Sequence, residues 1–201
     1  IKGDKGDDII SDQGNPTDLT FAGNSGIFGN DGKDLITMTA ATKSVVAQGG
    51  AGDDTINGGA AADTLTGGSD NDSITGNAGA DVLKGSTGND GFYYANRAEL
   101  IGETGGADQV IDLVDGGDGD DLLSIGGNAL IRIGQNGADT LARVTKVETL
   151  TRSAAGVTTI VGGTAARISD FRIFDFSNGG DNAQTISMNG VDVAVTIKGG
   201  I

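Results

Sequence analysis

The sequence predicts an all-β protein in which short repeats coil into a parallel β-helix, or solenoid. Three observations lead to this fold class. Residues 49–93 divide without a gap into five nine-residue units, every unit begins with glycine, and position eight of every unit is apolar. A unit of this length has room for one turn and one short strand, and glycine-rich nonapeptides of this form stack into parallel β-helices.

The five units read GGAGDDTIN, GGAAADTLT, GGSDNDSIT, GNAGADVLK and GSTGNDGFY. The last three residues of each unit are predicted to form a short strand. Because side chains alternate along a strand, the position-eight residue points inward while its two neighbours face solvent. The inward residues are Ile56, Leu65, Ile74, Leu83 and Phe92.

The first six residues of each unit form a loop that can bind a metal ion. Glycines at the first, second and fourth positions permit positive φ and let the loop turn its carbonyl oxygens inward. Position six is always aspartate, which adds negative charge: Asp54, Asp63, Asp72, Asp81 and Asp90. Calcium is a hard cation that takes about six to eight oxygen ligands, so two such loops together can bind it.

These units resemble the calcium-binding repeats of the repeats-in-toxin (RTX) family, the haemolysin-type repeats of secreted bacterial proteins. The resemblance implies that two nonapeptides make one turn of a right-handed parallel β-roll. Loops two units apart then stack on one edge and share a calcium ion. The implied pairs are Asp54 with Asp72, Asp63 with Asp81, and Asp72 with Asp90.

The resemblance also implies that backbone carbonyls complete each calcium shell, from positions two and four of one loop and positions one and three of the next. The carbonyls are those of Gly50, Gly52, Gly67 and Ser69 for the first pair, Gly59, Ala61, Gly76 and Ala78 for the second, and Gly68, Asp70, Gly85 and Thr87 for the third. Ala61 and Asp70 stand at the fourth position, where the family prefers glycine. We therefore expect these two loops to be strained or weaker.

Downstream, the nine-residue phase continues through a degenerate unit. Residues 94–102 place Glu99 at position six, although the loop glycines are missing, and Asp108 lies eighteen residues beyond Asp90 with Val110 in the apolar slot. A four-residue slip at residues 112–115 follows. We therefore expect Asp108 to continue the column of aspartates.

Four more copies lie outside the clean repeats. After the slip, GGDGDDLLS (116–124) and GQNGADTLA (134–142) place Asp121 and Asp139 eighteen residues apart, so these two could share another ion. Upstream, GDKGDDIIS (3–11) and GNDGKDLIT (29–37) carry Asp8 and Asp34 and are separated by an insertion that holds the only proline. The sequence leaves the partners of these two upstream loops open.

The predicted domain organisation is a β-roll over residues 1–142 and a β-rich region over 143–201. From residue 143 onward, short β-branched runs bounded by Gly, Asn and Ser indicate strands. A solenoid needs its last open turn covered, so this region is expected to be a cap. Many RTX proteins end in an uncleaved type I secretion signal, and residues 191–197 would suit one; the sequence leaves this open.

Composition separates a folded repeat from a flexible linker and excludes several functions. The chain has 37 glycines, but a linker would not hold an apolar residue at one slot of nine. With no cysteine and no histidine, it has no disulfides and no Cys or His zinc ligands. A net charge of −15 argues against nucleic acid, and no apolar run reaches the length of a membrane span. Paired acids such as Asp53 and Asp54 are explained by calcium loops, so no enzyme activity is expected.

We interpret the chain as a calcium-dependent extracellular structural or assembly domain of an exported bacterial surface protein, such as a surface layer, adhesin or filament. It begins within a repeat and without Met, so we expect it to be part of a longer protein. A single thin layer of apolar side chains would not fold so glycine-rich a chain without calcium. The expected partners are calcium and either further copies of the chain or a cell-surface glycan. The alternative is an accessory roll of a secreted RTX enzyme or toxin.

Overall fold

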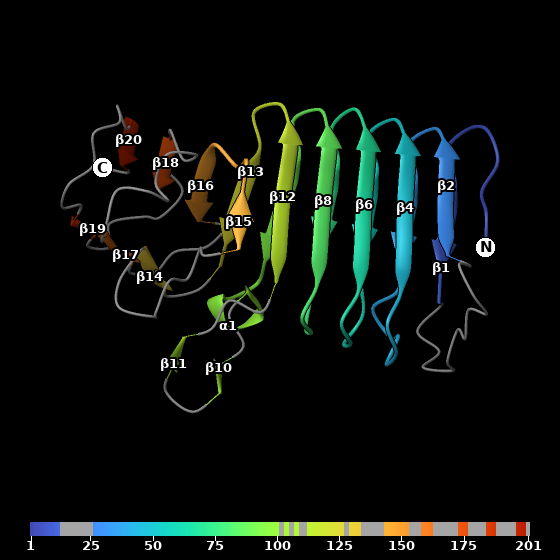
Figure 1. Ribbon diagram of the computed structural model, residues 1–201. Coiled ribbons are helices and arrows are strands. Elements are labelled where there is room, and N and C mark those ends of the chain that lie inside the picture. Colours follow the sequence, from blue (N-terminus) through green and yellow to red (C-terminus); the bar gives the residue numbers. More distant parts are fainter. Residues whose placement is uncertain are drawn as a thin grey trace.

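The computed structural model describes residues 1–12, 26–100, 103–104, 107–108, 112–126, 129–133, 143–152, 158–162, 173–176, 184–187 and 196–199. In the described residues up to 152, two large parallel sheets face each other (Figure 1). The chain alternates between them, so each turn of the coil adds one strand to each sheet. The predicted parallel β-roll is thereby confirmed.

The six-stranded sheet contains, in spatial order, β15 (Val144–Thr145), β12 (Leu113–Asp118), β8 (Val82–Thr87), β6 (Thr64–Ser69), β4 (Val46–Ala51) and β2 (Ile27–Asp31). The nine-stranded sheet contains β1 (Ile9–Ser11), β3 (Leu35–Thr37), β5 (Thr55–Asn57), β7 (Ser73–Thr75), β9 (Gly91–Tyr94), β13 (Leu122–Ile125), β16 (Thr149–Arg152), β18 (Ile173–Phe176) and β20 (Thr196–Gly199). All neighbouring strands in both sheets are parallel.

The strands of the two sheets differ in length, which the repeat pattern alone did not predict. β5 and β7 cover only positions seven to nine of their units, as expected. β6 and β8 run on through positions one to three of the next unit, because these residues pair in register with the neighbouring turn. Gly50 pairs with Gly68, and Ala51 with Ser69. The first half of every second loop is therefore held in the sheet.

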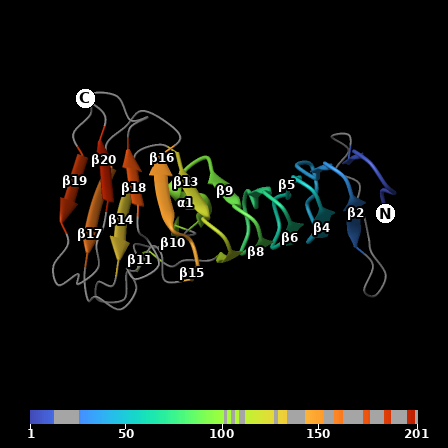
Figure 2. The ribbon, with the colours of Figure 1, turned by 90° about the horizontal axis from the view of Figure 1, so that it is seen from above.

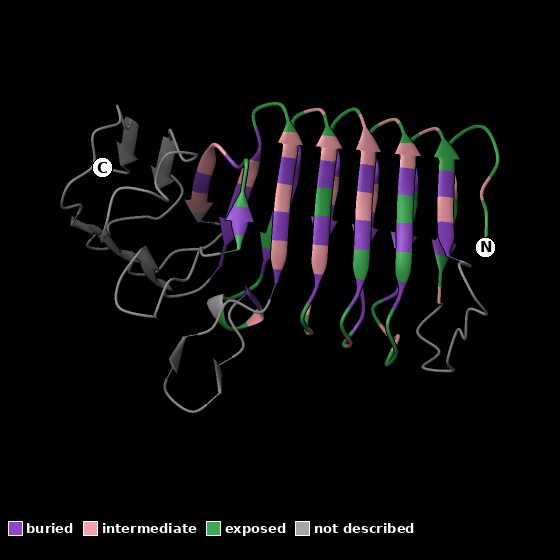
Figure 3. Ribbon diagram, in the orientation of Figure 1, coloured by how far each residue is buried: buried purple, intermediate pink, exposed green. Residues whose placement is uncertain are grey.

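The core is one layer of side chains between the two sheets. Registers place the position-eight residues directly above one another, and the strands alternate between buried and accessible residues (Figure 3). One sheet contributes Ile10, Ile36, Ile56, Ile74, Phe92, Leu123 and Leu150, and the other Ile27, Ala47, Leu65, Leu83, Val114 and Val144. Burying each of the larger side chains contributes about 1.5–3 kcal/mol.

The two edges of the roll differ. One, which we call the regular edge, is formed by six-residue loops of constant length: 3–8, 29–34, 49–54, 67–72, 85–90 and 116–121. The other, the variable edge, is formed by segments of very different lengths: 12–26, 38–45, 58–63, 76–81, 95–112 and 126–143. Short arcs line the regular edge at the top of Figure 1, and longer excursions hang from the variable edge.

Residues 97–100, 103–104 and 107–108 add no strand to either sheet of the roll, so the predicted phase through residues 94–102 is wrong. They contain the short helix α1 (Arg97–Leu100) and the antiparallel pair β10 (Glu103–Thr104) and β11 (Ala107–Asp108). Glu99 accepts hydrogen bonds from Ala95 N at 2.8 Å and Asn96 Nδ2 at 3.1 Å, and so caps the helix. Within the described ranges, no helix is long and apolar enough to cross a membrane.

Beyond residue 126 the solenoid continues. β16, β18 and β20 extend the nine-stranded sheet, while β14 (Ala129–Ile133), β17 (Thr158–Gly162) and β19 (Gln184–Ser187) form a separate parallel sheet (Figure 2). The nine-stranded sheet contains strands from both sides of residue 142. The predicted domain boundary at this residue stays a prediction. Most of the proposed signal segment, residues 191–197, lies outside the described residues.

Candidate metal centre

The aspartates of the regular edge form a continuous column. One carboxylate oxygen, Oδ1, of each position-six aspartate accepts a hydrogen bond of 2.8 Å from the backbone N–H of the equivalent residue one turn earlier. The donor and acceptor pairs are Asp8 and Asp34, Asp34 and Asp54, Asp54 and Asp72, Asp72 and Asp90, and Asp90 and Asp121. The stacking of Asp54, Asp72 and Asp90 is as predicted, and the column also takes in Asp8 and Asp34, whose partners the sequence left open.

In five of these six aspartates the second carboxylate oxygen has no partner, while Asp8 Oδ2 accepts a hydrogen bond from Asp4 N. Oδ2 is buried and accepts no hydrogen bond in Asp34, Asp54, Asp72, Asp90 and Asp121. Leaving a buried charged oxygen unpartnered costs more than an ordinary lost hydrogen bond, so such groups usually mark an ion. Five in one column fit a row of cations between successive loops.

The first glycine of each loop leaves the space beside this oxygen. A Cβ atom at Gly49 would collide with Asp54 Oδ2, and one at Gly67 would collide with Asp72 Oδ2. The same relation holds along the whole edge for Gly3, Gly29, Gly85 and Gly116. The glycine that opens each unit is therefore required by the carboxylate five residues later.

The regular loops share one backbone conformation, with the second and fourth positions left-handed. In the loop 49–54 these are Gly50, with φ of 132°, and Gly52, with φ of 114°. The conformation persists where the residue is not glycine: φ is 84° at Asn30, 95° at Ser86 and 76° at Asp70. Asp70 is therefore strained, as its departure from the repeat pattern predicted.

The predicted carbonyl ligands of this edge lie in these loops. The carbonyl of Gly50 is approached by Ser69 Oγ at 3.5 Å and that of Gly68 by Thr87 Oγ1 at 3.4 Å, both long for hydroxyl donors. The carbonyl of Ser69 accepts a hydrogen bond from Gly52 N at 3.1 Å. Their role as calcium ligands, with that of Gly67 and Gly85, stays a prediction.

Burial makes the column electrostatically unfavourable without a counter-ion. Desolvation raises the pKa of Asp72 to about 7 and the pKa values of Asp54 and Asp121 to about 6, and it also raises the pKa of Asp90. Backbone N–H donors oppose this shift, while neighbouring aspartates add to it for Asp54, Asp72 and Asp121. A divalent cation would relieve both desolvation and repulsion.

On the variable edge, Asp63 differs from every regular-edge aspartate of the clean repeats. It stacks with Asp81 as predicted, since Asp63 N donates to Asp81 Oδ1 at 2.8 Å. However, its own oxygens are both satisfied by backbone, Oδ1 by Val45 N at 2.7 Å and Oδ2 by Gly59 N at 2.7 Å. Asp63 thus has no unpartnered carboxylate oxygen, which weakens the predicted ion between Asp63 and Asp81.

The backbone of that loop also follows a different path. Among the described residues, left-handed φ occurs at neither Gly59 nor Ala61 in the loop 58–63, whereas the next loop on this edge has it at Asn77 and Gly79. The strain predicted at Ala61 is avoided because the loop does not adopt the regular conformation. The loop also contacts the segment 38–45 of the previous turn, since Ala60 N donates a hydrogen bond to the carbonyl of Ala41 at 3.0 Å. Gly76 and Ala78 lie in the more regular loop.

Asp112 follows Asp81 on the variable edge, and Asp121 follows Asp90 on the regular edge, where Asp108 was predicted. Asp81 N donates to Asp112 Oδ1 at 2.8 Å, and Leu113 pairs with Val82. The prediction for Asp108 is wrong, because its backbone pairs with Glu103 in the antiparallel excursion. The signal was present in the sequence: Asp112 lies nine residues before Asp121, as Asp63 lies nine before Asp72.

The last carboxylate of the regular edge is Glu148. Its Oε2 accepts a hydrogen bond of 2.9 Å from Asp121 N, the contact that an aspartate makes in earlier turns. Asp139, the partner predicted for Asp121, lies outside the described residues. The sequence Glu148-Thr149-Leu150 repeats the order acid, polar, apolar of Asp63-Thr64-Leu65, which could have revealed the site.

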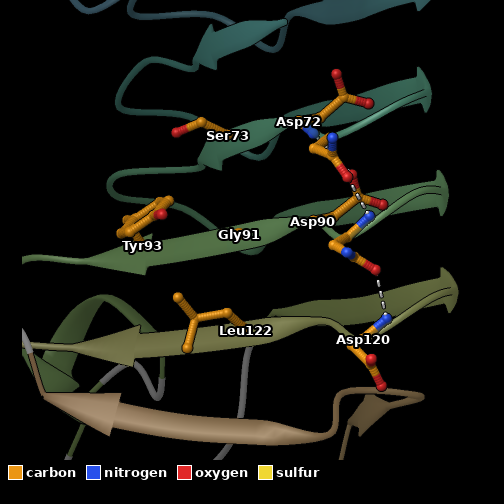
Figure 4. A pocket seen from close by; sticks show the side chains of 9 residues that line it. Asp72, Ser73, Asp90, Gly91, Tyr93, Asp120 and Leu122 are labelled. Atoms are coloured by element: carbon orange, nitrogen blue, oxygen red, sulfur yellow. Dashed lines mark hydrogen bonds between the residues drawn. The ribbon is translucent and has the colours of Figure 1, made fainter. Parts of the chain in front are cut away.

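A second ladder runs along the outside of the regular edge at position five. Asn71 Oδ1 accepts from Asn89 N at 2.8 Å, and Asn89 Oδ1 accepts from Asp120 N at 2.9 Å (Figure 4). Asp53 Oδ1 accepts two hydrogen bonds from Asn71, which lower the pKa of Asp53. Here each side chain bonds forward to the next turn, opposite to the position-six ladder, so together the ladders fix the spacing of the loops.

The donors available on these edges favour calcium over transition metals. In the part of the chain that the structure describes, no three His, Cys, Asp or Glu side chains converge on one point. An ion here must therefore take most of its ligands from backbone carbonyls, with one or two carboxylates. Oxygen-only shells of this kind suit calcium and do not suit zinc.

Comparison with known families supports the metal assignment. Residues 46–74 and 57–92 match the RTX calcium-binding nonapeptide repeat, four copies of which make up the family's sequence model. The repeats of this family bind calcium, and the matched residues supply both edges of the central turns. Neither the curated proteins nor the solved structures contain a significant match to the chain.

Proposed function

We propose that this chain is a calcium-dependent structural domain of an exported bacterial protein, and that calcium binding folds it after secretion. The observation that carries this proposal is the column of five buried, unpartnered Oδ2 atoms on the regular edge. A fold that collects such oxygens at the spacing of its own turns is incomplete without cations. Its stability therefore depends on the concentration of free calcium.

Export provides the change in calcium concentration that this dependence requires. Scarce free calcium in the cytosol leaves the repeats without their counter-ions, so the chain stays unfolded and can pass a secretion channel of the type I kind. Millimolar calcium outside the cell suits weak extracellular sites. The proposed location is accordingly extracellular, at the bacterial surface. The aspartates serve the metal, so the proposed role is structural and not catalytic.

Within this class we favour a surface layer, adhesin or filament, with further copies of the chain or a cell-surface glycan as partner. Two exposed features support contacts of this kind. Ile9 and Val46 are 79% and 50% exposed near the N-terminal turns. Tyr93 lies over the backbone of Gly91 beside a hollow that Asn89 and Asp120 help to line, an aromatic and polar combination suited to a sugar (Figure 4).

The test is a calcium titration of the chain, with far-UV circular dichroism and sedimentation measured in the same samples and magnesium as the control. A coil-to-β transition with calcium alone, together with large ordered assemblies, is the expected result. Folding to a monomer would favour the alternative, an accessory roll of a secreted enzyme or toxin. β structure that persists in chelator would overturn calcium-coupled folding.

A further inference from the structure

Tyr94 occupies an unusual place on the variable edge. It is the last residue of β9 and stands at the position where the earlier turns have the first loop glycine, Gly58 or Gly76. Its side chain is 1% exposed and points inward, whereas its neighbour Tyr93 is 39% exposed on the outer face. A tyrosine hydroxyl is thereby carried into the region that elsewhere holds the carboxylate oxygens.

Three oxygens on this part of the variable edge are buried and have no hydrogen-bond partner: Tyr94 Oη, Asp81 Oδ2 and Asp112 Oδ2. Asp81 and Asp112 are both fully buried and are joined by the 2.8 Å hydrogen bond from Asp81 N to Asp112 Oδ1. The hydroxyl lies near enough to interact with both carboxylates, since their charges contribute to the raised pKa of Tyr94. Its contact with Asp112 falls short of hydrogen-bond geometry, so all three oxygens remain unsatisfied.

Other charged groups nearby do not complete this cluster. Arg143 lowers the pKa of Asp112 through its charge, but its side chain is exposed and Asp112 Oδ2 still accepts no hydrogen bond. Glu99 adds a further negative charge on the side of Tyr94. Gly76 lets the carboxylate approach the backbone closely, because a Cβ at this position would collide with Asp81 Oδ2. The cluster is therefore a buried, negatively charged set of hard oxygen donors.

We propose that Asp81, Asp112 and Tyr94 hold one further calcium ion, in a site where a tyrosine hydroxyl serves as a neutral ligand. The inference rests on the proposed calcium function of the roll but concerns a different donor set. A hydroxyl oxygen has lone pairs to offer a cation while its proton remains available to a carboxylate. Two carboxylates supply the charge, and carbonyls of the loop 76–81 are at hand for the rest.

Terbium, which replaces calcium and emits when a nearby tyrosine is excited, tests this site in the full chain. The chain has two tyrosines and no tryptophan, so Tyr93→Phe is a matched control for Tyr94→Phe. We expect Tyr94→Phe to lose most of the tyrosine-sensitised emission and to bind one calcium ion fewer by equilibrium dialysis. Tyr93→Phe should keep the full number of ions and most of the emission.

Two further outcomes separate this inference from the general function. Removing a buried, unpartnered hydroxyl should not destabilise the calcium-free chain, so impaired folding would not confuse the result. Asp112→Asn keeps an acceptor for Asp81 N and should lose the same ion. Unchanged ion count and emission in Tyr94→Phe would overturn the tyrosine site while calcium-dependent folding of both variants still supported the proposed function.

Discussion

The two edges of the roll are built from the same nonapeptide, but their loops differ in length, backbone conformation and carboxylate contacts. On the regular edge the six loops from 3–8 to 116–121 have the same length and the same left-handed second and fourth positions, apart from the second position of the first loop, and only the connection that carries Glu148 is shorter among the described residues. Five of its six aspartates leave an oxygen unpartnered. The variable edge has one loop with an alanine at the fourth position, one with Val45 in place of aspartate, and three long excursions.

The difference shows which part of a repeat is constrained by metal and which only by the core. Insertions on the variable edge leave both sheets in register, since Leu83 stacks on Val114 despite the excursion between them. The roll therefore tolerates added length wherever the strands can resume their apolar positions. On the regular edge an extra residue would remove an aspartate from the column, where we expect the ions to bind.

The largest expected effect comes from neutralising matched aspartates on the two edges. Asp72→Asn removes the charge of an unpartnered oxygen that two neighbouring ions would share, so the calcium midpoint of folding should rise by about tenfold or more. Asp63→Asn replaces a carboxylate that backbone already satisfies. It should cost about 1 kcal/mol through one weakened hydrogen bond and shift the midpoint by less than about fivefold. Far-UV circular dichroism against free calcium measures both.

The comparison is well matched, because Asp63 and Asp72 are 1% and 3% exposed and each receives a backbone hydrogen bond at Oδ1 from the previous turn. Equal midpoint shifts in the two variants would show that the edges bind calcium alike, and that the unpartnered oxygens do not mark the ions.

The sequence predicted the regular edge well because the nine-residue spacing and the aspartates of the loops stay in step there. The clean repeats gave the parallel roll, its inward residues and the stacking of Asp54, Asp72 and Asp90. The prediction for Asp108 failed because the eighteen-residue spacing was counted forward from Asp90, whereas the whole insertion lies before Asp112. Counting backward from Asp121 would have found Asp112, but nothing local distinguishes an insertion that precedes a loop from one that follows it.

Other features depend on neighbours that a single repeat cannot reveal. The orphaned oxygens, the satisfied carboxylate of Asp63 and the substitution of Glu148 for aspartate all arise from contacts between turns. Ala61 and Asp70 look equivalent in sequence, yet only Asp70 adopts the left-handed conformation. The first is free to relax because its loop borders the irregular segment 38–45, while the second is held by regular loops on both sides.

We expect pH to have an intermediate effect on the stability of the fold, since protons neutralise aspartates on both edges. The folded-state pKa values of Asp72 and Asp112 are raised to about 7, and those of Asp54, Asp81 and Asp121 to about 6, from an ordinary value of 3.8. The folded chain therefore binds more protons than the unfolded chain between these limits. Without calcium, the stabilisation of the fold by these bound protons is fully present below about pH 4 and is lost as the pH rises through 6 to 7.

Calcium should reverse this dependence, because the ion competes with the same protons. The calcium midpoint of folding should rise as the pH falls from 7.5 to about 5. Circular dichroism in chelator and in calcium over this range gives both curves. Under acidic chelator conditions Asp72→Asn and the unmodified chain should be similarly structured. A calcium-free chain that gained structure as the pH rose would contradict the raised pKa values.

The smallest expected effect distinguishes the edges by backbone conformation alone. Asp70→Gly relieves the left-handed φ of 76° and should raise the free energy of unfolding in saturating calcium by about 0.5–1 kcal/mol. Ala61→Gly makes the equivalent change at the fourth position of a variable-edge loop that is not left-handed. It should lower the same free energy by a similar amount, because glycine only adds freedom to the unfolded chain. Urea unfolding of the two variants measures the pair. If the two loops hold different conformations, the two substitutions must change the free energy of unfolding in opposite directions. Stabilisation by both would mean that the Ala61 side chain alone keeps its loop from adopting the regular conformation.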